Sequence, residues 1–178
     1  MTPTFVQEKL TRCMDEGQRI VIDLQFTDIM RPQVCGVREI VVILPLLDRF
    51  RASPQELSSL TSQLMRCWGV QRQTWHPAAM HITSFQGPFL PYLNKVHWKS
   101  WNIKTHEQAV QDVFKTDELI YLTPDSDNVL DVIESDKVYV IGGIVDRTTT
   151  KVSCSACMWH LLSRGVAADT AVLWYMHT

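Results

Sequence analysis

Two short β-rich runs in the second half of the chain, Leu119–Thr123 and Lys137–Ile141, constrain the fold more than any other feature. Branched and aromatic residues of this kind favour strands, and each run ends in a loop. The loop after the second run opens with Gly142-Gly143 and reaches a carboxylate at Asp146. Glycines directly after a buried strand can take a positive φ and approach a ligand closely, because no Cβ intervenes. We therefore expect a ligand at this turn.

Strand-like and helix-like patterns alternate along the rest of the chain. Strands are predicted at Arg19–Leu24, Ala78–Ser84 and around Ile103. Helices are predicted at residues 53–69, 105–114, 126–133 and 153–163, the first from a capping box at Ser53 to a stop at Gly69. Such alternation predicts an α/β fold with a mostly parallel sheet covered by helices on both faces. Ligands in such sheets bind at the carboxyl ends of the strands.

Composition indicates a single globular domain. The chain has 178 residues, of which 46% are hydrophobic and 20% charged, values that argue against disorder or a membrane bundle. Its longest apolar run, Ile40–Leu47, is too short to span a bilayer. A net charge of −2 gives no overall attraction to nucleic acid. Any RNA contact therefore needs a local basic patch.

The cysteines and the N-terminus bear on cellular location. Five cysteines at mostly wide spacings argue against a disulfide framework. Cys154 and Cys157, with His160 beyond, have the spacing of half a zinc site, but no second pair completes four ligands, so no metal site is expected. The N-terminus has neither a secretory nor a mitochondrial pattern. We expect a protein of the nucleus or cytoplasm.

Three blocks of sequence carry a family resemblance: RIVIDLQFTDIM from Arg19, LSSLTSQLMRCWGVQRQTWHPAAMHITSF from Leu57, and DELIYLTPDSDNVLDVIESDKVYVIGGIVD from Asp117. Together they resemble the tRNA guanine-9 N1-methyltransferase family of the SPOUT, or α/β-knot, superfamily. The third block is the most specific of the three. The resemblance extends over Arg19–Arg147 with one interruption.

The resemblance implies a parallel α/β domain whose C-terminal part forms a trefoil knot that holds S-adenosylmethionine. It implies a monomeric enzyme that methylates N1 of the purine at position nine of tRNA. Leu122, Thr123 and Pro124 would line one cofactor loop, and Gly142 and Gly143 a second. No membrane or metal is implied.

The resemblance also assigns roles in catalysis and in substrate binding. Asp146 matches the acid proposed as general base, which can accept the proton on guanine N1 as the methyl group is transferred. Arg147 is a candidate phosphate contact. Asp23, at the end of the first strand, is a secondary candidate for substrate binding that can equally satisfy loop amides.

Two departures from the family pattern are expected to matter. Residues 34–54 form an extra segment inside the domain 19–178, either an insertion or translated intron, and its apolar run fits a strand or a buried helix equally. Residues 1–18 form a short lead segment. After Asp146 the last cofactor loop and final helix of the family have no clear match, so an incomplete knot and a truncated C-terminus are expected. A catalytically inactive remnant, with at most weak RNA or protein binding, is therefore the alternative function.

Simpler interpretations remain open for individual residues. Gly142-Gly143 also fits a plain strand-to-loop turn, and Asp146 a solvated or helix-capping acid. Trp98 and Trp101 could stack a base, although core packing is more common for tryptophan pairs. An ordinary nucleotide-binding sheet is a weaker alternative, because GGIVD contains neither G-x-G-x-x-G nor a P-loop lysine.

Overall fold

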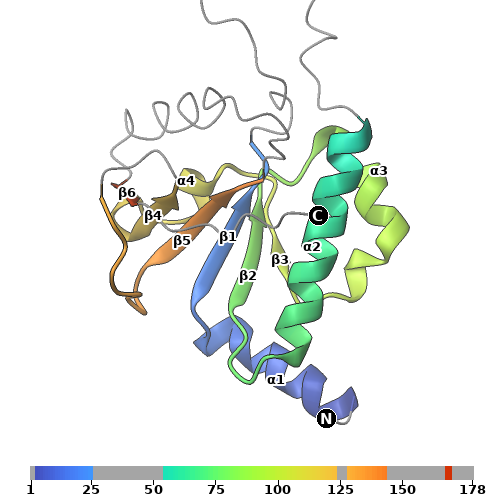
Figure 1. Cartoon of the computed structure of the whole chain (residues 1–178), viewed down its shortest axis with the longest axis horizontal. Helices are drawn as coiled ribbons and strands as arrows, with labels where there is room; N and C mark the ends of the chain where they lie inside the picture. The colour runs from blue at the N-terminus through green and yellow to red at the C-terminus, as the bar shows by residue number, and fades with distance from the viewer. Residues whose placement is uncertain (1–2, 26–53, 124–127, 144–166, 170–178) are drawn as a thin grey trace, which may run out of the picture.

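A six-stranded parallel sheet organises the part of the chain that the computed structural model describes, namely residues 3–25, 54–123, 128–143 and 167–169 (Figure 1). The strands lie in the order β3-β2-β1-β5-β4-β6, and every neighbouring pair is parallel. Their bounds are β1 Arg19–Asp23, β2 Ala79–Thr83, β3 Lys104–Thr105, β4 Leu119–Leu122, β5 Val138–Gly142 and β6 Ala167–Asp169.

Two long helices and several short ones accompany the sheet. The α-helices are α1 Pro3–Glu16, α2 Pro54–Gln73, α3 Leu90–Leu93 and α4 Val110–Val113. The 3-10 turns are η3 Gly87–Phe89, η4 Asn94–Val96, η5 Trp98–Ser100 and η6 Thr116–Glu118. No helix in the described part of the chain is both long and apolar enough to cross a membrane.

The core has a layer on each face of the sheet because successive strand residues point to opposite sides. On one face, Leu60 and Leu64 of α2 pack with Ile22 and Ile82 of the sheet. On the other face, Val21 belongs to a second cluster, whose other buried members are Val110 of α4 with Leu119, Tyr121, Val138 and Val140. The predicted sheet with helices on both faces is confirmed.

Helix α1 packs across the amino ends of the strands, where Figure 1 shows it below β1 and β2. Its Leu10 and Cys13 are buried. Lys9 is buried as well, and its Nζ donates to the carbonyl oxygens of Arg72 at 3.0 Å and Thr74 at 2.6 Å. The last carbonyls of a helix have no partner within the helix, so Lys9 fixes the end of α2 to α1. The lead segment 1–18 thus contains a helix that sequence patterns did not predict.

Three predicted helix boundaries are wrong. Gly69 does not end α2, because a glycine inside a helix costs only about 1 kcal/mol and the helix continues to an end held by Lys9. The predicted helix 105–114 shortens to α4, because Thr105 pairs with Ile82 in the sheet and cannot serve as the cap.

The third error concerns the predicted helix 126–133. Residues 128–133, the part that the structure describes, are not helical. The side chains of Val129, Val132 and Ile133 are exposed. A helix this short is marginal unless it buries an apolar face, and here there is no such burial.

The tryptophan pair belongs to the core. Trp101 stacks on Trp68 of α2 with ring centroids 6.0 Å apart, and Trp98 meets Phe85 edge to face at 4.8 Å. Both tryptophans pack against the cluster under α2. The core-packing interpretation therefore explains their position.

A histidine pair lies beside the second core cluster. His81 of β2 and His106 are stacked, with Nδ1 of His81 3.0 Å from Nε2 of His106, and Phe114 meets His81 edge to face. Burial, followed by the positive charges of His106, Lys104 and Arg19, lowers the pKa of His81 to about 4. His81 is therefore neutral near pH 7, and one of the two facing ring nitrogens donates to the other.

Several expectations fall on residues outside the described part of the chain. These are the extra segment 34–53, the helix 153–163 with its cysteines, and the C-terminal knot expected after Asp146. Within the predicted domain 19–178, the structure also describes Ala167–Asp169, which form β6.

Candidate functional site at the carboxyl edge of the sheet

The carboxyl ends of β1 and β5 meet at the centre of the sheet. The strand that follows β1 in the chain, β2, lies on the side of β1 away from β5. The strand that follows β5, β6, lies on the side of β5 away from β1, beyond β4. Ligands of open parallel sheets bind at such a reversal of strand order, outside the carboxyl ends of the strands. Asp23 pairs with Gly142 across this point, and Leu122 pairs with Ile141 next to it. The topology therefore brings Asp23, Gly142 and Leu122 together at this edge.

Gly143 is a glycine because β5 ends against β1. Its N–H donates to the carbonyl oxygen of Asp23 at 2.8 Å. A Cβ at Gly143 would lie 2.7 Å from Cδ2 of Leu24 and 3.0 Å from that same carbonyl oxygen. Gly143 does not have a positive φ, so that part of the expectation is wrong for this residue. Close approach between two strands explains the residue type.

The Asp23 carboxyl is fully buried, with 0% of the residue exposed. Its Oδ1 accepts hydrogen bonds from the Gln25 backbone N–H at 3.1 Å, the Thr83 hydroxyl at 3.1 Å and the Ser84 hydroxyl at 3.2 Å. Its Oδ2 has no hydrogen-bond partner in the described part of the chain. Burial raises the pKa of Asp23, and the three hydrogen bonds oppose that rise. One oxygen thus joins the ends of β1 and β2, while the other is left for a donor.

Backbone hydrogen bonds hold the loop after β2, and with it the Ser84 hydroxyl, in place. The Ser84 N–H donates to Gln108 and the Phe85 N–H to His106. Ser84 has a φ of 52°, a left-handed conformation that costs an L-residue about 1 kcal/mol or more. The strain is maintained by these bonds and brings the Ser84 hydroxyl onto Asp23. Sequence reasoning missed Thr83 and Ser84, although their position at the carboxyl end of the predicted strand Ala78–Ser84 was the available signal.

Each predicted site residue within the described ranges lies at this edge. Thr123 follows β4 and is fully buried, and Leu122 is half-buried beside Ile141. Asp169 of β6 pairs with Leu122, a neighbour that the sequence did not reveal. Pro124, Asp146 and Arg147 lie outside the described residues. Among the residues described, no cluster of three or more His, Cys, Asp or Glu side chains could hold a metal.

Comparison with known families matches residues 48–158, more than half of the chain, to the family described as tRNA (guanine(9)-N(1))-methyltransferase TRM10/TRM10A. The chain belongs to this family. The match begins before α2 and ends beyond Asp146, so it includes Thr123, Gly142 and Gly143 of the TRM10-family chain.

Curated relatives carry the same family name. The tRNA (guanine(9)-N1)-methyltransferase of Schizosaccharomyces pombe is 28% identical over 152 residues, which cover 82% of this chain and 43% of the relative. Human tRNA methyltransferase 10 homolog A is 33% identical over 102 residues, which cover 54% of this chain and 30% of the relative. The TRM10-family chain therefore spans less than half the length of these relatives.

Solved structures resemble the chain in fold. The crystal structure of full-length spTrm10 in complex with SAH aligns with a TM-score of 0.67 at 24% identity, covering 89% of this chain and 78% of that one. A dual specific Trm10 from Thermococcus kodakaraensis aligns with a TM-score of 0.56 at 18% identity, covering 85% and 75%. These likenesses confirm the predicted α/β fold, with a mostly parallel sheet flanked by helices, for this TRM10-family chain.

Proposed function

We propose that this chain transfers a methyl group from S-adenosylmethionine to N1 of guanine at position nine of tRNA. The observation that carries the proposal is the register that sets Asp23, Gly142 and the end of β4 side by side at the strand-order reversal of a TRM10-family chain. The family description supports the reaction.

The residues at this edge fit a cofactor with hydrogen-bond donors and positive charge. A buried carboxylate oxygen without a partner is unfavourable, and Oδ2 of Asp23 has no partner among the residues that the structure describes. A cationic donor at the edge would relieve it. The loops after β4 and β5 would hold the cofactor through Leu122, Thr123, Pro124, Gly142 and Gly143. SAH, S-adenosylhomocysteine, is bound in the related spTrm10 structure.

The chemistry needs one proton acceptor from the chain. The cofactor supplies an electrophilic methyl group on a sulfonium sulfur. Guanine N1 carries a proton, and Asp146, three residues beyond Gly143, would accept it while the methyl group passes from the sulfonium sulfur to N1 and S-adenosylhomocysteine is released. Arg147 meets a phosphate of the substrate and fixes its position. Residues 19–178 form the catalytic domain, with 34–54 as an extra segment, and the protein acts as a monomer in the nucleus or cytoplasm.

The direct test measures methyl transfer from labelled S-adenosylmethionine to unmodified tRNA that carries guanine at position nine. The intact chain should label this tRNA but not one with cytosine there. Asp146→Asn should lower the rate roughly 10²- to 10⁴-fold, the usual contribution of a general base. Asp131→Asn is the matched control, because Asp131 is an exposed acid in the connection between β4 and β5.

Two results would contradict the proposal. One is no transfer under conditions where the full-length S. pombe relative is active; the other is an equal loss in Asp146→Asn and Asp131→Asn, which would remove Asp146 from its role. Calorimetric titration with S-adenosylhomocysteine addresses the inactive-remnant alternative. Submillimolar binding is expected for the enzyme, whereas no binding would favour the remnant.

A further inference from the structure

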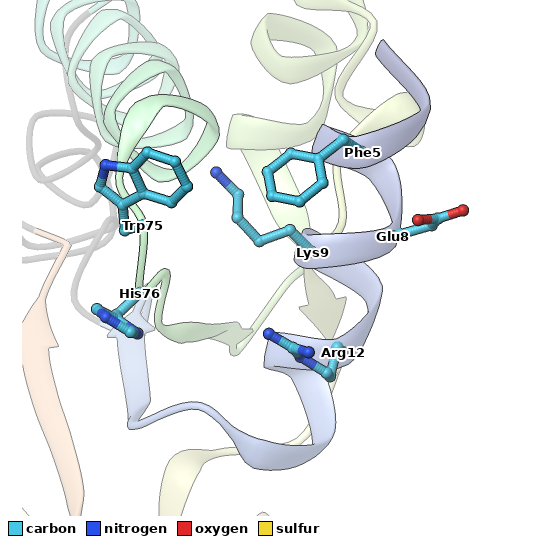
Figure 2. Close-up of a pocket in the computed structure, with 6 residues that line it drawn as sticks. All are labelled: Phe5, Glu8, Lys9, Arg12, Trp75 and His76. Carbon is cyan, nitrogen blue, oxygen red and sulfur yellow. The ribbon is translucent and has the colours of Figure 1, made fainter. Parts of the chain in front are cut away.

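A cavity lies at the end of the molecule opposite the candidate site, under the amino ends of the strands. It measures about 380 Å³ and lies between α1 and the turn that follows α2 (Figure 2). Its lining consists of Phe5, Glu8, Lys9 and Arg12 of α1 with Trp75 and His76 of the turn. The volume is in the range of small-ligand sites, roughly 300–1,000 Å³. The position is separate from the carboxyl edge by the length of a strand.

The two sides of this cavity are held in a fixed relation. The four α1 residues follow the spacing of one helical face. On the other side, Trp75 follows directly after Thr74, whose carbonyl oxygen accepts the 2.6 Å hydrogen bond from Lys9. Trp75 and Phe5 meet edge to face with centroids 6.4 Å apart. The cavity is therefore formed before any ligand arrives.

The aromatic residues of the cavity are exposed. Trp75 is 69% exposed and Phe5 43%, whereas Trp98 and Trp101 are packed into the core. An indole presented to solvent beside a hollow offers a flat face on which a planar ring can stack. This face is a feature that residue patterns alone did not single out.

The charges around the cavity favour an anion. Lys9 and Arg12 are cationic, but Nζ of Lys9 is engaged by the carbonyl oxygens of Arg72 and Thr74, so Arg12 is the cation that a ligand can reach. Figure 2 shows the Arg12 guanidinium directed toward His76, while the Glu8 carboxylate points away from both. Arg12 has an ion pair with Glu16 at 3.6 Å, but both side chains are more than 70% exposed. Exposed pairs of this kind contribute little, so Arg12 can exchange Glu16 for a phosphate.

We propose that this cavity binds one unstacked nucleotide of an RNA chain, with the base stacked on Trp75 and the phosphate at Arg12. Aromatic stacking of bases is tolerant of sequence, and contacts of arginine to phosphate position the nucleic acid. This inference rests on the proposed function in one respect only, namely that the bound RNA is a tRNA. Because a five-residue strand is about 17 Å long, the bound nucleotide would be a different one from the methylated guanine.

The experiment follows the indole N–H signals of the intact chain by NMR. Trp75→Phe assigns the Trp75 signal by its disappearance. Titration with pentauridylate should shift that signal, and an acidic peptide with one phenylalanine should not. Binding of tRNA is then measured for Trp75→Ala and Arg12→Ala, with Ile133→Ala and Lys115→Ala as exposed apolar and cationic controls elsewhere.

Stacking of one base predicts that Trp75→Ala weakens tRNA binding about ten-fold. Arg12→Ala should lower the salt dependence of log Kd by about one phosphate contact. The controls should bind as the unchanged chain does. If Trp75→Ala proves to be unfolded, the pentauridylate shift in the unchanged chain decides the matter.

Three results would overturn the inference: no shift of the Trp75 signal with RNA, a shift with the peptide alone, or unchanged tRNA affinity in folded Trp75→Ala. Methyl transfer measured in parallel separates the two proposals. Methyl transfer to tRNA without any RNA-dependent shift of the Trp75 signal would reject the nucleotide-binding cavity and support the proposed function. A Trp75 response without transfer supports the cavity and rejects the function.

Discussion

Replacing Gly143 by alanine tests the close contact that brings β5 against β1 at the candidate site. The added Cβ would lie 2.7 Å from Cδ2 of Leu24 and 3.0 Å from the carbonyl oxygen of Asp23. Carbon atoms normally approach to about 3.5–4.0 Å. Leu24 is buried, and the carbonyl of Asp23 accepts the hydrogen bond of Gly143 itself. Neither atom can move away without disturbing the core or the pairing of the strands.

The expected loss follows from overpacking, which costs about 1–3 kcal/mol in a well-packed core. In a domain of this size each kcal/mol changes the Tm by roughly 2–4 °C, so Gly143→Ala should lower the Tm by roughly 2–12 °C. Gly69→Ala is the matched control. Apart from its chain neighbours and its own helix backbone, no atom of the described residues lies within 4 Å of a Cβ there, and alanine favours a helix interior by about 0.5–1 kcal/mol. Its Tm should therefore rise.

Thermal unfolding followed by circular dichroism gives both values, and urea titration checks that the m-value stays constant. The decisive quantity is the sign of the two changes. If Gly143→Ala raised the Tm as Gly69→Ala does, β5 would not end against Leu24 and Asp23 as the structure has it. The register between Asp23 and Gly142 would then have to be abandoned as the basis of the site.

The remaining predictions concern pH. A histidine in the unfolded chain has a pKa of about 6.5. The stability that His81 provides is therefore complete above that pH, and it falls by up to roughly 3 kcal/mol as the pH drops toward the folded-state pKa of about 4. His81→Asn, whose amide can still reach His106, should flatten this slope in urea titrations; an unchanged slope would assign it to other groups. Burial raises the pKa of Asp23, so its ionisation weakens the fold as the pH rises above about 3.9. Asp23→Asn should therefore gain stability relative to the unchanged chain between pH 4 and 7, and a relative loss would refute the buried, unpartnered carboxylate.

The strands of the sheet were predictable, while the helix ends were not. Runs such as Arg19–Leu24 and Lys137–Ile141 are apolar on both faces, a local property that a sequence displays directly. The extent of α2 depends on Lys9, more than sixty positions away, and α1 is stabilised by packing on β2 and α2. Such contacts exist only after the chain has folded, so Gly69 and the lead segment were misjudged.

At the candidate site, too, some residues could be predicted from the sequence and others could not. Thr123, Gly142 and Gly143 could be named from the resemblance and lie at the expected edge. The pairing of Asp23 with Gly142 could not be read from spacing, since it requires β5 to insert between β1 and β4. Ser84 was missed because its left-handed backbone is imposed by hydrogen bonds from the loop to Gln108 and His106.

Asp23 connects these elements through three separate atoms. Its Oδ1 accepts from the Thr83 and Ser84 hydroxyls at the carboxyl end of β2, its carbonyl oxygen accepts from Gly143 at the end of β5, and its buried Oδ2 has no hydrogen-bond partner among the described residues. The first two links fix the ends of three adjacent strands before any ligand binds, which is the kind of preorganisation that a binding site requires. The third is an acceptor, at the centre of that rigid edge, that no described residue satisfies. A cationic donor bound there would lower the pKa of Asp23 toward its ordinary range. The ionised carboxyl of Asp23, which by itself weakens the fold, would then stabilise the complex with that donor.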